Sequence, residues 1–186
     1  MKFNSHIENI CSKISKTVGI MYYLKGMLPP KCLKLIYFSL IQSYIQYCLP
    51  IFGSTYDAHI EPLRILQKRA IRIINNASYY AHTEPLFFRS NILKIDDLYL
   101  HSIACYAFKN RDLLDNYRRT HSYNTRFRNL LLPPMERLRS SSQSVYFNVT
   151  ELWDNIPLPI RQSNSYQSFK FAYKRHLLSQ YEHSSQ

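Results

Sequence analysis

Hydrophobic residues recur every three or four positions near the start of the chain. This stripe consists of Phe3, Ile7, Ile10, Ile14 and Met21, with Val18 between the last two. Residues at that spacing share one face of an α-helix and can be buried together. Gly26 and the pair Pro29-Pro30 then interrupt the pattern. The sequence therefore predicts an amphipathic helix over residues 4–25.

A second helix is predicted from Pro30 or Lys31 to Cys48, followed by a connector over residues 51–56. Residues 35–56 carry no charge. An uncharged segment of this length could also be a membrane span, so that alternative must be considered. Within this run the polar side chains recur at helical spacing, at Ser39, Gln42, Ser43 and Gln46. A polar stripe beside an apolar face favours a helix packed in a globular domain over a membrane span.

A third helix is predicted over residues 58–75, where Pro62 is tolerable because it lies near the helix start. Its apolar face gathers Ile60, Leu63, Leu66, Ala70, Ile71, Ile73 and Ile74, and its other face gathers Arg64, Lys68, Arg69 and Arg72. Gln67 is the polar exception within the apolar stripe. Because an unpaired buried amide costs roughly 1–3 kcal/mol, we expect Gln67 to make a specific hydrogen bond in or near the core.

Further helices are predicted along the rest of the chain. Thr83 and the Glu84-Pro85 pair are typical of a helix cap and first turn. Asp96 or Asp97 is expected to cap an apolar helix over residues 98–111, and a last helix is predicted over 166–181. The alternating pattern of strands is scarce. We therefore expect an all-α fold.

Composition excludes several classes of protein. Only 3 of the 186 residues are Gly, and they are too far apart for the glycine-rich phosphate loops of Rossmann and P-loop proteins. The 4 Cys form no CxxC pair, and the first residues contain no apolar secretory signal. These features predict an intracellular protein, nuclear or cytoplasmic and not secreted, with reduced thiols.

The charge is strongly basic and unevenly distributed. The chain has 24 Lys and Arg against 12 Asp and Glu, giving a net charge of +12, and residues 1–50 and 101–150 each contribute +5. An excess of this size favours an anionic partner, such as nucleic acid or a membrane surface.

The densest positive charge lies in an Arg- and Ser-rich arm in which Tyr117, Tyr123 and Phe127 are interleaved with arginines. These are Arg118, Arg119, Arg126, Arg128, Arg137 and Arg139. Arginine binds phosphate through two parallel hydrogen bonds, and aromatic rings stack on unpaired bases. The alternative is a solvated loop whose charge serves solubility. The helix face with Arg64, Lys68 and Arg72 is likewise open to nucleic-acid contact or to ordinary solvent exposure.

The sequence shows no self-sufficient active site. Polymerases hold their metal ions on an Asp-Asp pair in a tight hairpin, with another carboxylate beside it. Asp96-Asp97 instead opens a predicted apolar helix, and helix capping is its favoured role. His101 and Cys105 lie four residues apart and could share a metal, but two ligands do not make a structural zinc site. Ordinary packing is favoured there, and we expect no metal and no cofactor.

Six local motifs, taken in order, resemble the C-terminal region of the reverse transcriptases of non-LTR retrotransposons of the LINE type, related to jockey and CR1. They are His6-Ile7 with Lys13-Ile14-Ser15-Lys16, Leu35–Ile41 with Tyr44–Cys48, Leu66–Ile74, Ile92–Leu98, Tyr123-Asn124-Thr125-Arg126, and Leu152–Pro157 with Phe169-Lys170. One departure is Asp154, where the family usually has Asn. Aspartate accepts the same hydrogen bonds but cannot donate.

The resemblance implies a thumb and post-thumb fragment of an RNA-directed DNA polymerase. In the family the polymerase and endonuclease residues lie upstream of the first matched motif, so this chain is expected not to be an enzyme on its own. Its expected segments are a thumb-like helical bundle (1–78), a central helical segment (79–112), the basic arm (113–144) and a C-terminal helical segment (145–186).

The expected partner is RNA or DNA, such as a primer–template, bound through its backbone without sequence specificity. The candidate contacts are Lys13, Lys16, Arg64, Lys68, Arg69 and Arg72, together with the six arginines of the arm. The resemblance gives structural roles to Gln67, Thr125, Trp153, Pro157 and Phe169. No membrane partner is expected.

The alternative function is a domesticated or degenerate helical protein-interaction module whose 16 Tyr form an interface. Without the polymerase palm, the first helix is expected to expose an apolar strip at Phe3, Ile7 and Ile10. Such a strip would bind the missing palm or a second copy of the chain.

Overall fold

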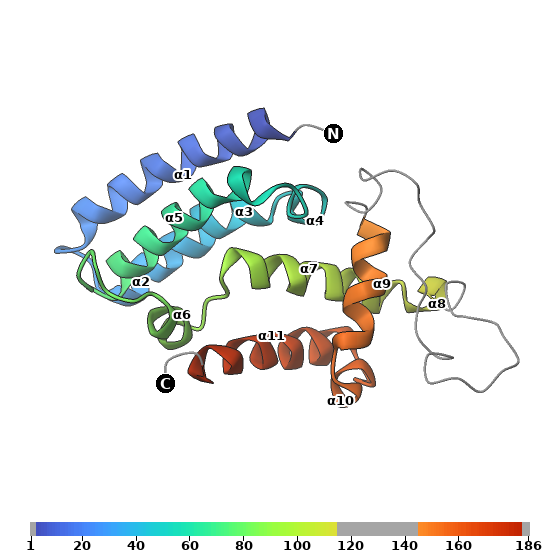
Figure 1. The fold of residues 1–186 in the computed structure, drawn as a ribbon. Helices are drawn as coiled ribbons and strands as arrows, with labels where there is room; N and C mark the ends of the chain where they lie inside the picture. The colour runs from blue at the N-terminus through green and yellow to red at the C-terminus, as the bar shows by residue number, and fades with distance from the viewer. Residues whose placement is uncertain (1–2, 115–144, 184–186) are drawn as a thin grey trace, which may run out of the picture. The chain divides into compact units, whose positions relative to one another are not determined.

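The computed structural model describes residues 3–114 and 145–183. Every regular element within these ranges is a helix, and no strand occurs in them (Figure 1). The all-α prediction is confirmed for this part of the chain. The helix predictions over 4–25, 58–75 and 166–181 agree with the observed helices to within one or two residues.

The described residues form two compact units. Unit 1 extends to Leu98 and also includes the residues from His176 onward, whereas unit 2 lies within Tyr99–Arg175. Unit 1 contains α1 (Asn4–Leu24), α2 (Pro30–Ile36), the π-helical segment η1 (Tyr37–Gln42), α3 (Ser43–Gln46), α4 (Leu49–Phe52), α5 (Asp57–Ile74), α6 (Glu84–Ser90) and the start of α7 (Ile95–Lys109). Unit 2 contains the rest of α7, α8 (Arg111–Leu114), α9 (Val145–Asn155), α10 (Leu158–Arg161) and most of α11 (Tyr166–His183), whose last turns belong to unit 1.

Helix α1 buries the hydrophobic stripe that the sequence predicts, and it packs mainly on α5 and also on η1 and α3. Ile7 and Ile10 are only 3% and 5% exposed. The expectation of an exposed apolar strip is therefore wrong for these two residues, because the chain's own helices cover them. The exposed apolar side chains of α1 lie instead near its C-terminal end, at Ile20, Tyr22 and Tyr23.

The second predicted helix is observed as one run of three consecutive elements, α2, η1 and α3. Tyr37, Ile41 and Ile45 are fully buried, and Ser39, Ser43 and Gln46 are exposed, as the polar stripe predicts. The run ends at Gln46, two residues before the predicted end, and Cys48 then adopts a left-handed backbone conformation with φ of 58°. Helix α4 then forms where we expected the connector to begin. In the described part of the chain, no helix is both long and apolar enough for a membrane span.

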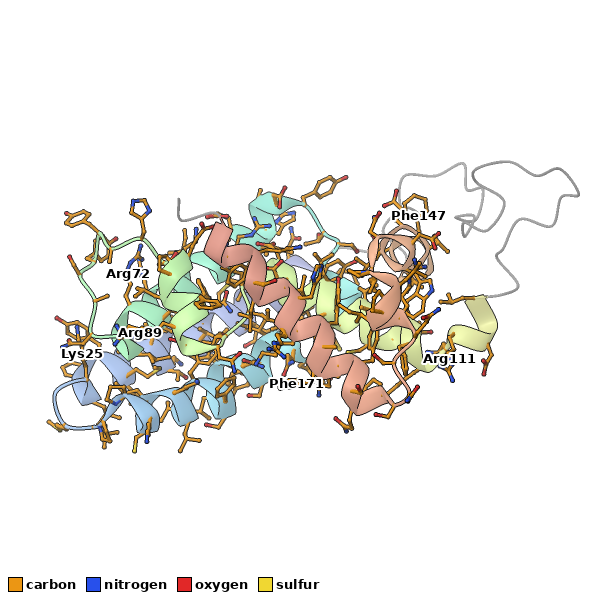
Figure 2. The ribbon with its side chains drawn as sticks, turned by 90° about the horizontal axis from the view of Figure 1, so that it is seen from below. Lys25, Arg72, Arg89, Arg111, Phe147 and Phe171 are labelled. Atoms are coloured by element: carbon orange, nitrogen blue, oxygen red, sulfur yellow. The ribbon has the colours of Figure 1, made fainter. Side chains whose placement is uncertain are left out.

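Helix α5 turns its apolar face into the core of unit 1 and its cationic face outward. Arg72 in its last turn lies at the same end of unit 1 as Arg89 of α6 and Lys25, which follows α1 (Figure 2).

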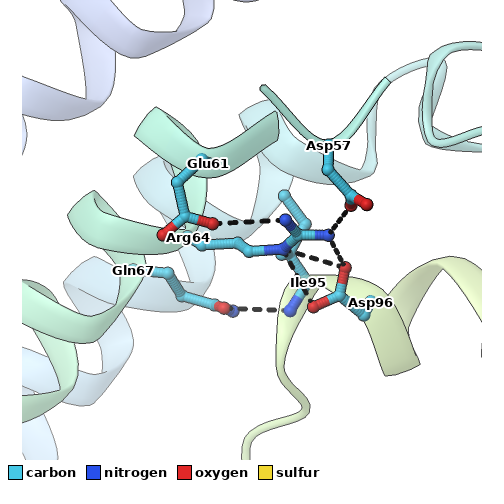
Figure 3. Close-up of polar contacts among 6 residues, drawn as sticks. All are labelled: Asp57, Glu61, Arg64, Gln67, Ile95 and Asp96. Atoms are coloured by element: carbon cyan, nitrogen blue, oxygen red, sulfur yellow. Dashed lines mark hydrogen bonds and ion pairs between the residues drawn. The ribbon is translucent and has the colours of Figure 1, made fainter. Parts of the chain in front are cut away.

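Gln67 is buried within α5 at 2% exposure and makes three hydrogen bonds, of which Figure 3 shows the one to Ile95. Its Nε2 donates to the Tyr37 hydroxyl at 2.8 Å and to the Leu93 carbonyl at 3.0 Å, and its Oε1 accepts from the Ile95 N–H at 2.9 Å. The expected specific hydrogen bond is thus confirmed. The single amide joins α5 to η1 and to the first turn of α7.

The two aspartates at the start of α7 lie inside its first turn, so neither is the cap that we expected. Asp96 accepts from Arg64, and Asp97 accepts a short hydrogen bond from the Tyr181 hydroxyl. The Lys94 N–H donates to the same Tyr181 oxygen at 3.1 Å. Burial raises the pKa of Asp97, and it also raises the pKa of Tyr181. These contacts hold the end of α11 against unit 1.

The core of unit 2 is a row of aromatic rings. Phe169 stacks on Phe108 with ring centroids 4.4 Å apart, and lies 6.0 Å from Trp153 and 5.9 Å from Tyr173. Tyr173 in turn stacks on His101 at 6.2 Å. Two motif residues of the sequence analysis, Trp153 and Phe169, are therefore buried at the centre of this unit.

Two further residues of the Leu152–Pro157 motif lie at or just before the start of α10. Pro157 is the N-cap residue of α10, where its extended backbone begins the helix. Asp154, the departure from the family pattern, accepts from Arg161 Nη1 at 3.3 Å. A carboxylate suits this position because the partner is a cation.

The buried Gln67 amide gives a stability prediction. Gln67→Leu nearly preserves the volume but leaves the Tyr37 hydroxyl, the Leu93 carbonyl and the Ile95 N–H without their partner. We expect unit 1 to lose about 3 kcal/mol of unfolding free energy, measured by urea unfolding and far-ultraviolet circular dichroism. The matched control is Gln46→Leu on an exposed position of α3. A change of less than about 0.5 kcal/mol in both variants would contradict the role of Gln67.

We expect the buried side chain of His101 to make the stability of unit 2 depend on pH. Burial lowers the pKa of His101, the cations Lys170 and Lys174 lower it further, and its Nε2 donates to the Lys170 carbonyl at 3.1 Å. Because the neutral form is favoured in the fold, its stabilisation is present above the ordinary pKa of 6.5 and is lost as pH falls through the lower folded-state pKa.

Urea unfolding at pH values from about 7.5 to about 5, followed by the fluorescence of Trp153, tests this dependence within unit 2. The wild type should lose stability toward the acid end. In His101→Gln, whose amide does not titrate but can donate to the same carbonyl, the loss should be much smaller. An equal loss in both proteins would assign the acid sensitivity to other groups.

Candidate nucleic-acid interface

The cations that the sequence nominates for nucleic-acid binding lie in several different environments. Six of them, Arg118, Arg119, Arg126, Arg128, Arg137 and Arg139, and the motif residue Thr125 fall outside the described residues. The other six lie on α1 and α5, where each can be judged by its neighbours.

Arg64 lies at the centre of an acidic cluster (Figure 3). Its guanidinium donates from Nη2 to Asp57 at 2.7 Å, from Nη1 to Glu61 at 3.2 Å, and from Nε and Nη2 to Asp96 at 3.1 and 2.7 Å. The hydrogen bonds to Asp96 are the main cause that raises the pKa of Arg64. Three carboxylates thus satisfy this guanidinium, and it has little capacity left for a phosphate.

Lys68 is exposed and lines a pocket of mixed charge between α5, α6 and the start of α7. The pocket has a volume of about 380 Å³ and also contains Glu84, Lys94 and Asp96. Lys94 Nζ is 2.5 Å from Glu84 Oε1, and this hydrogen bond lowers the pKa of Glu84. The carboxylates in this pocket make it a poor site for an anion.

Lys13 and Lys16 are exposed on α1. Lys13 Nζ lies over the Tyr44 ring at 5.2 Å from its centroid, and Lys13 lines a 480 Å³ pocket together with His6 and Tyr47. The structure does not bring these two lysines into the groove that contains Arg69 and Arg72.

Arg69 and Arg72 line a groove of about 720 Å³ between α1, α5 and the segment that follows α5, and we call it the α1–α5 groove. Its third cation is Lys25. Of the residues that line the groove, none is acidic, and Arg69 and Lys25 make no ion pair with any described residue. Three cations without a local counter-charge favour an anionic ligand.

The walls and floor of the α1–α5 groove differ from its cationic rim. The walls contain Tyr22, Tyr23 and Tyr79, which are 66%, 79% and 65% exposed. The floor is apolar and includes the nearly buried side chains of Val18, Leu66 and Ile73.

Arg72 links the rim of the groove to its wall. Its Nε donates to the Ala81 carbonyl at 3.1 Å, and its guanidinium lies 5.9 Å from the centroid of the Tyr79 ring. Arg72 therefore holds the segment after α5 in place as well as contributing charge.

A second basic pocket lies beside the C-terminal turn of α5, where Ile74 lines this pocket and the preceding Ile73 lines the α1–α5 groove. Its volume is about 240 Å³, and its cations are Lys31, Lys34 and Arg89. The residues that line it include no acid. One end of unit 1 thus has two neighbouring basic depressions.

Sequence reasoning identified only part of the lining of the α1–α5 groove. It identified Arg69 and Arg72 from the charged face of one helix. It missed Lys25, Tyr22 and Tyr79 because residues from three separate segments converge only in the fold. The sequence did hold one signal for this groove. The run Tyr22-Tyr23-Leu24-Lys25, at the end of the first predicted helix, places aromatic side chains next to a cation.

The described residues contain no group of three or more His, Cys, Asp or Glu side chains placed to hold a metal ion. His101 and Cys105, the pair considered from the sequence, are both buried, with the sulfur 3.9 Å from each ring nitrogen. Burial raises the pKa of the Cys105 thiol and lowers that of His101, as expected for groups packed neutral inside a core.

Comparison with known proteins gives one distant similarity. No protein-family model and no solved structure matches the chain. The chain is similar to the RNA-directed DNA polymerase from mobile element jockey of Drosophila melanogaster, with 28% identity over 100 residues. The aligned residues cover 52% of this chain and 11% of that protein. The chain is thus distantly similar to part of a retrotransposon reverse transcriptase and spans only a small fraction of its length.

The acidic cluster around Arg64 yields a further stability prediction. Arg64→Gln leaves Asp57, Glu61 and Asp96 with no shared cation, so the carboxylates repel one another. Because the three acids are about half exposed or more, we expect a loss of only about 1 kcal/mol, measured by urea unfolding. Adding Asp96→Asn should recover part of this loss, and raising the salt concentration should shrink it. An additive double variant would contradict the coupling.

Proposed function

We propose that this chain is a non-catalytic nucleic-acid-binding module related to the C-terminal part of a non-LTR retrotransposon reverse transcriptase. The α1–α5 groove is the observation that carries this proposal, since its three cations have no acidic neighbour in the lining. The similarity to part of the jockey polymerase supports the same class of partner. The chain's role is to hold RNA or DNA through phosphate contacts, without sequence specificity.

The binding surface extends from the α1–α5 groove to the neighbouring pocket of Lys31, Lys34 and Arg89. A backbone that crosses the end of α5 would meet cations from both depressions. The arginines of the arm, which lie outside the described residues, are proposed to add further phosphate contacts. Arg64 is left out of this surface, because its guanidinium is satisfied by three carboxylates.

Charge removal at matched positions tests this proposal. The groove variant combines Lys25→Gln with Arg69→Gln, and the control combines Lys13→Gln with Lys16→Gln on α1. Both variants lose two positive charges, and none of the four side chains makes an ion pair with a described residue. A difference in binding between them therefore reports position and not net charge.

Affinity for a mixed set of dye-labelled RNA and DNA should be measured by fluorescence anisotropy between about 50 and 200 mM salt. The groove variant should bind about tenfold or more weakly, and its log–log salt slope should shrink by roughly 1.4–1.8, because two phosphate contacts are lost. The control should stay close to the wild type. Absence of wild-type binding at the lowest salt would refute the function. Equal losses in both variants would refute the groove as its site.

A further inference from the structure

We propose that the α1–α5 groove takes an unpaired nucleic-acid strand, with bases stacked on Tyr22 and Tyr79 and phosphates held by Lys25, Arg69 and Arg72. This inference rests on the proposed function and names the form of its ligand. It depends on the walls and floor of the groove, which contribute nothing to phosphate binding.

The distribution of polarity across the groove selects bases as well as phosphates. The same groove combines three kinds of surface. Its cations lie beside an apolar floor, formed in part by Val18 and Leu66, and beside walls of tyrosine side chains. A double helix turns only its charged backbone and its groove edges outward and keeps its base faces stacked inside. An unpaired strand offers flat base faces, for which aromatic side chains are the usual partners in proteins.

The tyrosines are arranged as exposed pairs at the two sides of the groove. Tyr22 and Tyr23 have ring centroids 6.3 Å apart at 78°, and Tyr79 and Tyr80 have centroids 5.3 Å apart at 89°. The two rings of each pair meet edge-on, and Tyr22 and Tyr79 remain 66% and 65% exposed, so both offer ring surface to a ligand. Arg72 adds a planar cation 5.9 Å from the centre of the Tyr79 ring, and Arg next to an aromatic platform strengthens base stacking.

Gly19 keeps the groove open from the α1 side. It lines the groove within the helix, and a Cβ added there would meet no atom within 4 Å. Glycine in a helix interior is less stable than alanine, and packing does not require it at this position. The groove, with a volume of about 720 Å³, lies within the size range of sites that bind small ligands or a few nucleotides.

The experiment compares one strand in two forms. A labelled oligo-uridine strand of about 12 nucleotides is measured by fluorescence anisotropy, alone and after annealing to its complement. The test variant combines Tyr22→Leu with Tyr79→Leu, which keeps apolar bulk and removes the rings. The matched control combines Tyr47→Leu with Tyr56→Leu, since these tyrosines are 66% and 63% exposed and lie outside the groove.

We expect the wild type to prefer the single strand, and the test variant to bind it about tenfold or more weakly with an unchanged salt slope. Duplex affinity should be the same in all three proteins. Gly19→Leu, which fills the open side of the groove without changing charge, should reproduce the loss for the single strand. Cross-linking with 5-iodouridine should place adducts on Tyr22 or Tyr79.

The outcomes separate this inference from the function on which it rests. If the wild type binds neither form, the proposed function fails and this inference fails with it. If binding depends on Lys25 and Arg69 but the test variant keeps its single-strand affinity, or loses both forms equally, the function stands and the stacked strand is wrong. The tyrosine walls would then be assigned to a protein partner.

Discussion

The hydrogen bonds of one buried amide hold unit 1 together. Gln67 contacts the Tyr37 hydroxyl, the Leu93 carbonyl and the Ile95 N–H, so one side chain joins three elements. An unpaired buried amide is costly, and these bonds are satisfied in only one rotation of α5. That rotation directs Arg69 and Arg72 away from the core. The direction of the cationic face is thus a consequence of the hydrogen bonds that Gln67 makes from the opposite, buried face.

The same helix carries arginines in two different electrostatic environments. Arg64 is surrounded by Asp57, Glu61 and Asp96, and it stabilises the contact between α5 and the first turn of α7. Arg69 and Arg72, less than three turns further on, line a groove that has no acid in its lining. Position along one helix therefore separates an arginine surrounded by carboxylates from two arginines with no acid in their groove, although all three are the same residue type.

Helical periodicity predicted most of the described fold, because amphipathic stripes in α1, α2 to α3 and α5 need only local spacing. It even singled out Gln67. Long-range pairings could not be foreseen: Asp97 looked like a cap because its partner, Tyr181, lies far along the chain. The sequence also identified only some of the residues that line the α1–α5 groove, because the others come from distant segments. Arg69 and Arg72 share a helix pattern, whereas Tyr79 meets them only after folding.

The end of α11 has a consequence for how the chain folds during translation. The Tyr181 hydroxyl satisfies the half-buried Asp97 carboxylate, so unit 1 is complete only when residues from both sides of unit 2 are present. Unit 2 lies in one stretch between them. A ribosome must therefore release residues up to Tyr181 before this contact of unit 1 can form. A product that stops before residue 176 would leave the Asp97 carboxylate without the Tyr181 hydroxyl and would expose the surface of unit 1 that the last turns of α11 cover.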